Sequence, residues 1–400
     1  MATCAAAATE AAAQDDSIVL NNQLQLGDVI AGQTLNVVDA QDEVAASTSA
    51  QGVGLTGAVR NGSLTVTSTQ EVRGSVSAET TVTLGGDTDG PVNAVSQANG
   101  TYLGASAYDA DMRVASDQTY SGDAVEARMT VGDGEARLLG GASVGASAIA
   151  NTTALYTENG FVSGDTNQSS DAGLRALLNA ASQYIPAEAD FSTQAVANAF
   201  ASNGVASGQE LNVSQSSAGD IVEADTVATS GNAWDLVGRA NAAANQAQIG
   251  NQGGSLVLAT DQSNASAVRS SAYVSSYDFG EGVAHAQGVG NAVSAGNNDI
   301  FVQIDNAQFN SGGVEVTATF AGANGYDTYV SAEAAGNTVT GYGCSDCEGY
   351  LRADNVQINE GAVSAVATAT IAGSGRLTAS SAHAVGNSAT FYVSRPNSGD

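Results

Sequence analysis

Few residues in this chain could carry out chemistry, and their spacing does not form a catalytic group. There are two histidines, His285 and His383, and each stands between two alanines. Alternation along a strand could place both on one face, but repeat-equivalent surface positions explain the matching Ala-His-Ala contexts more simply than a metal pair does. A Gly-rich phosphate loop requires a lysine, and the sequence contains none. We therefore predict no catalytic residue.

The cysteines indicate a covalent link rather than a metal or redox site. Cys344 and Cys347 form one Cys-Ser-Asp-Cys in a Gly-rich segment, and Cys4 lies near the N-terminus. A single pair without a second pair or a nearby histidine cannot complete a four-ligand zinc site. A thioredoxin-like site would need a βαβ context that the sequence does not show. We predict a small disulfide between Cys344 and Cys347, and no metal or cofactor.

Carboxylates and aromatic residues do not form the pattern of a sugar-cleaving site. A glycoside hydrolase needs two carboxylates flanking one bond, and its substrate is usually held by aromatic side chains. Here the carboxylates are scattered and the single tryptophan, Trp234, stands alone in the sequence. Asp87 with Asp89, and Asp109 with Asp111, have the spacing of loose calcium loops, but such short motifs are common in acidic loops. An enzyme acting on polysaccharide is a minor alternative.

Composition and charge narrow the possible partners. Aromatic residues make up 5% and charged residues 13% of the chain, so small residues must form most of its interior. The 41 acidic residues against 11 arginines give a net charge of −30. Such a chain is repelled by the phosphates of nucleic acid and by anionic lipid. Divalent cations and cationic polysaccharides remain possible partners, and solubility explains the charge equally well.

Internal repeats are the strongest signal in the sequence. Leu-x-Val-like strand starts at residues 210, 255, 299 and 350 are separated by 45, 44 and 51 residues. Segments that alternate apolar and polar residues follow each start, which indicates strands. Stacked units of this length predict an all-β, elongated β-solenoid or β-helix with repeats of roughly 44–51 residues. Antiparallel packing of hairpin repeats is the alternative architecture.

Polar markers recur within each unit. A Gln or Asn follows most strand starts, and an Asn ends the third alternating segment. The Asn markers at Asn291, Asn337 and Asn387 step by 46 and 50 residues, close to the period of the strand starts. Because Asn and Gly tolerate left-handed backbone, we predict that these asparagines mark turns. Stacking would align Asn on Asn between neighbouring units. The predicted turn markers are Asn151, Asn291, Asn337 and Asn387.

One segment departs from the repeat. Leu174, Leu177 and Leu178 have helical spacing, with Asp171 as a candidate N-cap and Pro186 as a stop, and a second short helix is predicted from Ser192 to Asn203. We therefore predict a helical insertion that plugs or caps the solenoid, or docks a partner. The predicted division is a signal-peptide-like remnant (1–13), an N-terminal β-repeat region (14–160), the helical insertion (161–209), a C-terminal β-repeat region (210–393) and a polar tail (394–400).

The N-terminus suggests export. Residues 5–8 and 11–13 are alanines, as in the small-residue end of a secretory signal peptide, although a charged start and an apolar centre are missing. A disordered Ala-rich leader is the alternative. No run of 18 apolar residues occurs, so we expect no membrane span.

The lysine-free repeats rich in Ala, Val, Thr and Asn, with their Leu-x-Val, Gln/Asn and Gly-Asn markers, resemble the holdfast anchor proteins of stalked alphaproteobacteria, specifically the D component. The resemblance covers nearly the whole chain and carries over no catalytic residue. It implies an exported protein at the outer membrane that fixes adhesive polysaccharide to the cell together with a curli-like subunit and an outer-membrane lipoprotein. A generic adhesin or surface-layer protein is the competing interpretation.

Overall fold

The computed structural model describes residues 16–299, 301–343 and 350–393, and these residues form strands without any helix. All strand pairings among them are parallel. The strands are β1 (Asp16–Gln25), β2 (Val29–Val37), β3 (Val44–Val72), β4 (Val76–Leu84), β5 (Asp87–Thr88), β6 (Val92–Tyr120), β7 (Ala124–Val131), β8 (Arg137–Leu138), β9 (Ala142–Glu158), β10 (Phe161–Ser170), β11 (Gly173–Val205), β12 (Gly208–Ser217), β13 (Ile221–Gln252), β14 (Ser255–Asn264), β15 (Ala267–Asn297), β16 (Phe301–Asn310), β17 (Val314–Gly343), β18 (Tyr350–Asn359), β19 (Val363–Ile371) and β20 (Leu377–Val393).

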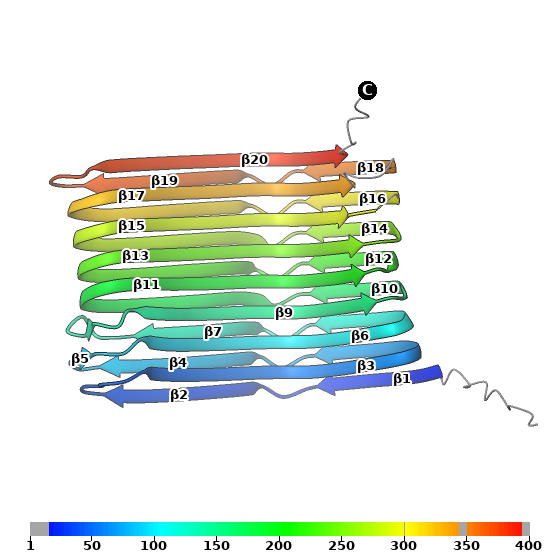
Figure 1. The fold of residues 1–400 in the computed structure, drawn as a ribbon, viewed down its shortest axis with the longest axis horizontal. Coiled ribbons are helices and arrows are strands. Elements are labelled where there is room, and N and C mark those ends of the chain that lie inside the picture. Colours follow the sequence, from blue (N-terminus) through cyan, green and yellow to red (C-terminus); the bar gives the residue numbers. More distant parts are fainter. Residues whose placement is uncertain (1–15, 300, 344–349, 394–400) are drawn as a thin grey trace, which may run out of the picture.

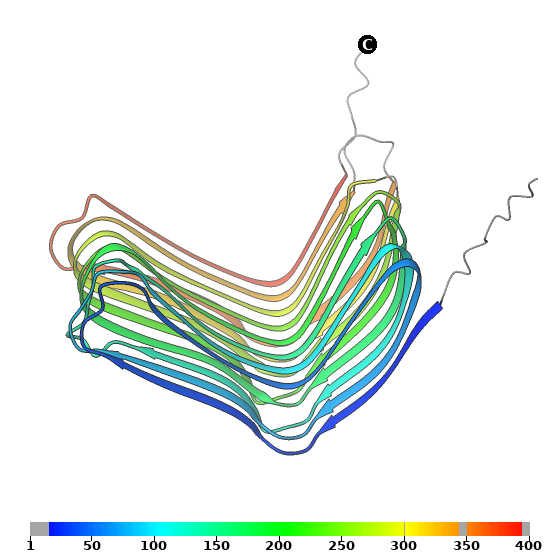
Figure 2. The ribbon, with the colours of Figure 1, turned by 60° about the horizontal axis from the view of Figure 1, so that its bottom comes forward.

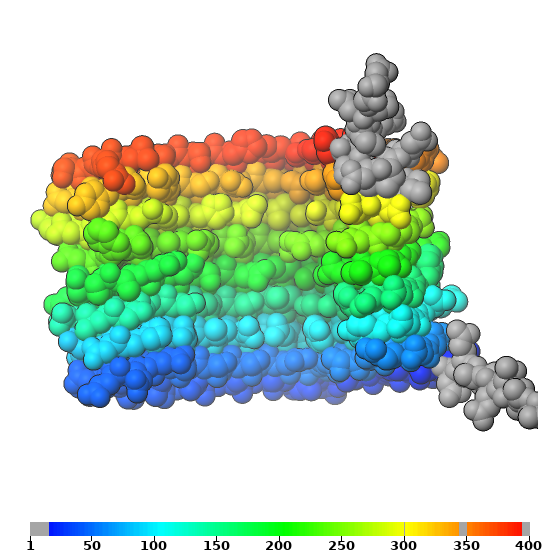
Figure 3. Space-filling model, in the orientation of Figure 1, coloured from blue at the N-terminus to red at the C-terminus, as the bar shows by residue number. Residues whose placement is uncertain are grey.

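The described residues wind into eight stacked coils, which appear as parallel bands in the ribbon and space-filling views (Figures 1 and 3). Equivalent glutamines in successive coils are 46 to 50 residues apart. The predicted β-solenoid is therefore confirmed. The first coil has a length similar to the others, because Ser17 of β1 pairs with Leu64 of β3, and Leu35 of β2 pairs with Val82 of β4.

Each coil is a flattened loop bent into a V, so that the solenoid has a convex and a concave layer (Figure 2). The coil that starts at β12 illustrates the path. β12 and the first part of β13 form the convex layer, and the chain then folds back near Trp234 and returns along the concave layer to Gln252. One residue of β13 between Ala243 and Asn245 has no partner in β15, which marks the bend of the concave layer.

The interior contains two apolar clusters, one in each arm of the V. One includes Val82, Val222 and Phe320, and the other includes Leu64 and Leu211. Most other members are Ala and Val, because the two layers lie close together and leave little room for larger side chains. Inward and outward residues alternate along most of β11, β13 and β15, as the period of a β-strand requires, and the alternation is interrupted at the bend and the fold-back.

The predicted helical insertion is wrong. Residues 173–205 form the single strand β11, which pairs with β13 on one side and with β7, β8 and β9 on the other. Leu174 and Leu178 are buried, as are the alanines at positions 176 and 180, so the burial period is two. Backbone pairing with a coil on each side outweighs the weak local helix preference of this Ala- and Leu-rich segment. The segment 161–209 is consequently one more coil of the solenoid.

No helix in the described part of the chain is long and apolar enough to cross a membrane.

Candidate functional site

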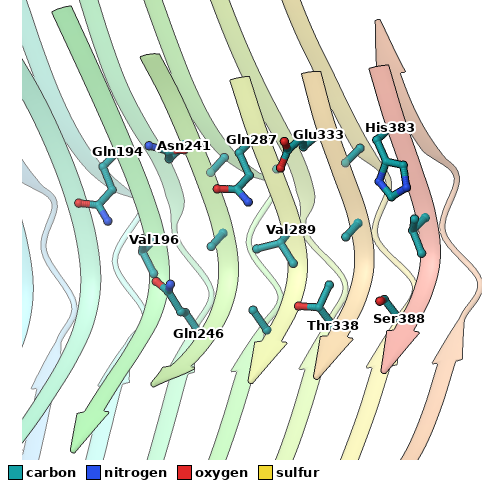
Figure 4. A pocket seen from close by; sticks show the side chains of 17 residues that line it. Gln194, Val196, Asn241, Gln246, Gln287, Val289, Glu333, Thr338, His383 and Ser388 are labelled. Carbon is teal, nitrogen blue, oxygen red and sulfur yellow. The ribbon is translucent and has the colours of Figure 1, made fainter. Parts of the chain in front are cut away.

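A groove of about 460 Å³ follows the bend on the concave face and crosses β11, β13, β15, β17 and β20 (Figure 4). One wall is a row of polar side chains that stand in register on successive strands. Parallel neighbours lie about 4.8 Å apart, so the row offers a new hydrogen-bonding group at each such step. Its members in the groove are Gln194, Asn241, Gln287, Glu333 and His383.

The floor of the groove is apolar and made of small residues. Val196, Val289 and Val385 alternate there with alanines at positions 243 and 335. The second wall carries Gln246 and Thr338, with Ser388 on the last strand. Figure 4 shows the two polar rows on either side of the valines. An extended polar polymer lying along the solenoid axis would find hydrogen-bonding groups on both sides and an apolar strip beneath it.

A buried asparagine ladder holds the strands at the bend. Each asparagine donates from Nδ2 to Oδ1 of the asparagine in the next coil, at 2.7 to 2.8 Å. The second Nδ2 hydrogen reaches a backbone carbonyl of the convex layer, as Asn245 does to Ser263 at 2.8 Å. The ladder thus ties the two layers together directly beside the groove floor. Its members are Asn151, Asn198, Asn245, Asn291, Asn337 and Asn387.

A glutamine ladder runs through all eight coils on the other side of the bend. Nε2 of each glutamine donates to Oε1 of the glutamine in the preceding coil, at 2.6 to 2.9 Å. Nε2 also donates to a backbone carbonyl of the concave layer. In the groove this carbonyl belongs to the second wall, as from Gln215 to Gln246 at 3.0 Å and from Gln308 to Thr338 at 2.9 Å. Buried polar groups with all partners supplied make a rigid, specific arrangement. The two ladders therefore fix the shape of the groove.

The comparisons with known proteins identify the family. Residues 38–313 match the family model of holdfast attachment protein D. The chain belongs to this family. No curated protein and no solved structure matches it. The matched residues include β3 to β16, and hence most coils of the solenoid and most members of both ladders. Membership in the family implies a structural role in holdfast attachment at the cell envelope.

In this holdfast attachment protein the four predicted markers Asn151, Asn291, Asn337 and Asn387 all belong to the asparagine ladder. They lie inside strands, at the bend, and not in turns between strands. Sequence reasoning missed Asn198, because it lies in the predicted helical insertion, and Asn245, which lies outside the marked units. Alanine precedes both residues, as it precedes Asn151. A search for Asn at the common step of 46 to 47 residues would have found both.

The two histidines are not at equivalent places. His285 is in register with Arg239 and Ser331, whereas His383 is in register with Glu333 in the adjacent row of the concave face. Among the described residues there is no group of three or more His, Cys, Asp or Glu side chains that could hold a metal ion. Cys344 and Cys347 lie outside the described residues, so their disulfide remains a prediction.

In the acidic pairs with calcium-like spacing, the side chains of Asp87, Asp109 and Asp111 join coils. Asp87 accepts from Arg137, with 3.0 Å between Oδ2 and Nη1. Asp109 accepts from Asn159 at 3.0 Å, and Asp111 accepts from the backbone N–H of Phe161 at 2.9 Å. These carboxylates therefore satisfy donors of the neighbouring coil.

Proposed function

We propose that this protein is exported to the cell surface and anchors the adhesive polysaccharide of the holdfast by holding the polymer in the groove at the bend. The observation that carries the proposal is the row Gln194, Asn241, Gln287, Glu333 and His383, in register over an apolar floor. Membership in the holdfast attachment family supplies the biological setting.

The chemistry of the groove suits sugar hydroxyl and acetamido groups. A primary amide offers two donors and an acceptor, so Gln and Asn can bind these groups in either sense. Each contact is weak, but many contacts on one scaffold act together because the first bound unit raises the effective concentration of the next. The excess of acid on the protein would attract an amine-bearing polymer. Charge would not dominate binding in the groove itself, because Glu333 and His383 are the ionisable side chains of the lining.

The expected partners follow from the family resemblance. The protein would work with a curli-like subunit and an outer-membrane lipoprotein, which would connect the solenoid to the outer membrane. Cells that lack the gene should shed their adhesive material into the medium. Retention of that material by such cells would contradict an anchoring role.

Groove variants test the binding mode. Asn241→Ala and Gln287→Ala should each weaken retention of the purified protein by its isolated adhesive polysaccharide in affinity electrophoresis, by about threefold each, since one hydrogen bond contributes ~0.5–1.5 kcal/mol. The double variant should lose about tenfold. Asn167→Ala, an exposed asparagine on the convex layer, is the matched control and should bind as the parent does. A double variant that binds like the parent, or a single variant that abolishes binding, would reject distributed binding in the groove.

Removal of one coil tests the same idea at larger scale. Deletion of residues 255–300 removes one full repeat, because Ser255 is in register with Phe301. Gln215 and Gln308 would then be neighbours in the glutamine ladder, so the rest should stay folded. Attachment should be partly weakened and not lost.

A further inference from the structure

Four aromatic side chains lie together on the edge where the coils fold back, and nothing in the groove accounts for them. We call this group the aromatic edge: Tyr184, Trp234, Tyr277 and Tyr326. Trp234 is the only tryptophan of the chain. Its exposed fraction is 55%, and those of Tyr277 and Tyr326 are 65% and 52%. Exposed aromatic surface that is concentrated in this way commonly marks a binding site.

The register explains how aromatic residues of different coils reach one edge. Tyr184 is in line with Asn232 and Asp278 on the next two coils. Trp234 and Gly280 occupy the same unpaired position of their coils, between residues that are paired in register. The four rings therefore come from four successive coils and follow the solenoid axis along one edge, which is the left edge in Figure 1.

Gly280 makes room for the tryptophan ring. A Cβ atom at Gly280 would lie 2.5 Å from the carbonyl oxygen of Trp234 and 3.1 Å from Cδ2 of its ring. Because that space is open, Trp234 crosses the intervening coil and meets Tyr326 edge to face, with 6.1 Å between ring centroids. Arg376 lies over Tyr326, with Cζ 5.5 Å from the ring centroid. The rings of Trp234 and Tyr326 are thus held in place before any ligand binds.

The core does not require these rings. The interior beneath them is filled by Phe279 and Phe320, which pack edge to face with 4.8 Å between centroids. A hollow of about 250 Å³ adjoins Trp234, and Tyr184, Asn232 and Asp278 also line it. The edge therefore combines aromatic faces with an amide and a carboxylate, the mixture found in small-molecule sites.

We propose that the aromatic edge is a second polysaccharide-binding site, in which pyranose rings stack their apolar C–H faces on Trp234 and its tyrosine neighbours while hydroxyl groups bond to Asn232 and Asp278. The inference rests on the proposed function, since it assigns a second place where the same polymer is held. Nucleic acid, which also stacks on aromatic rings, is disfavoured by the net charge of −30. The same charge opposes an anionic membrane surface.

The sole tryptophan allows a direct test with the full chain. Titration with hexamers of β-1,4-linked N-acetylglucosamine, glucosamine or glucose should give a saturable change of Trp234 emission for at least one sugar. Trp234→Ala should weaken calorimetric binding of that sugar about tenfold, as loss of one stacking ring does for bases. Trp234→Phe should restore most of the affinity. Tyr392→Ala is the control, because it removes a ring of similar exposure (57%) that lies in β20, away from the aromatic edge. This variant should bind as the parent does.

The outcomes separate this site from the groove. Sugar binding that leaves Trp234 emission unchanged and survives Trp234→Ala would overturn the aromatic edge and leave the groove intact. Binding that is lost in Trp234→Ala but normal in Asn241→Ala with Gln287→Ala would support the edge and reject the groove. An emission change with phosphatidylglycerol vesicles and none with any of the sugars would overturn the assignment to polysaccharide.

Discussion

Substitution of Asn245 by alanine should destabilise the centre of the solenoid more than any single change on its surface. Asn245 is buried and takes part in three hydrogen bonds. Its Nδ2 donates to the carbonyl of Ser263 at 2.8 Å and to Oδ1 of Asn291 at 2.7 Å, and its Oδ1 accepts from Asn198 at 2.8 Å. Asn245→Ala would remove all three bonds, leaving the buried Oδ1 of Asn291 without its donor and one Nδ2 hydrogen of Asn198 without its acceptor.

The expected loss follows from these contacts. A hydrogen bond contributes about 0.5–1.5 kcal/mol net, and a buried group left without a partner costs more, so the substitution should lower the free energy of unfolding by ~2–4 kcal/mol. Asn387→Ala is the matched control in the same ladder. Asn387 is exposed on the last coil, accepts from Asn337 and donates to Gln357 at 3.3 Å. Its replacement should cost less than ~1 kcal/mol.

Urea unfolding followed by circular dichroism, together with hydrogen exchange of the backbone amides, would measure the difference. Because repeats contact mainly their neighbours, faster exchange should be confined to the coils next to Asn245. Asn245→Asp should be more harmful at pH 7 than at pH 4, since a buried carboxylate carries charge and cannot donate. Equal stability of Asn245→Ala and Asn387→Ala would refute the view that the ladder holds the bend.

Three further outcomes are expected. Gly325→Ala should destabilise the fold by ~1–3 kcal/mol through overpacking, because the new Cβ would lie 2.3 Å from the ring of Phe279. Urea unfolding measures the loss, and an unchanged midpoint would contradict it. Burial raises the pKa of Asp225, so the unfolded chain releases this proton first. Stability should therefore fall as pH rises through the window above the ordinary Asp pKa, and Asp225→Asn should remove that part of the fall in pH-dependent melts. Cys344 and Cys347 of exported protein should resist alkylation until reduced, and mass spectrometry that finds free thiols or a bound metal would reject the disulfide.

The repeat, the all-β class and the approximate period could be predicted because stacking in register forces equivalent residues to recur. Glutamine at a fixed place in each unit is the clearest case, since each amide must meet an identical amide in the next coil. Asn306 and Gln308 both follow the strand start at 299 and both fit a Gln or Asn marker. Only Gln308 belongs to the glutamine ladder, and Asn306 bonds to Asn355 in a separate row. A period read from one residue type is thus accurate to a few positions only.

The wrongly predicted helix and the aromatic edge are two features that the sequence alone was not sufficient to predict. In β11, the spacing of Leu174, Leu177 and Leu178 fits a helix or a strand, and only the pairing partners decide. Trp234 seemed isolated because Tyr326 is two coils away along the chain. The contact arises because both residues occupy unpaired positions at the fold-back and because Gly280 lies between them. Neither condition leaves a local pattern in the sequence.

The rows of side chains along the solenoid axis differ in how uniform they are, and this difference distinguishes residues that the fold requires from residues that could bind a ligand. The buried glutamine ladder has the same residue type in all eight coils, since a different side chain would break bonds on both sides. The wall of the groove shares only polarity, because its side chains point to solvent and need no identical neighbour. The aromatic edge is confined to four coils, and in the described residues the other coils carry no ring at the fold-back. Uniform rows therefore belong to the architecture, whereas a row that varies or stops is not fixed by the neighbouring coil, and the groove wall and the aromatic edge are the two such rows that we assign to a ligand.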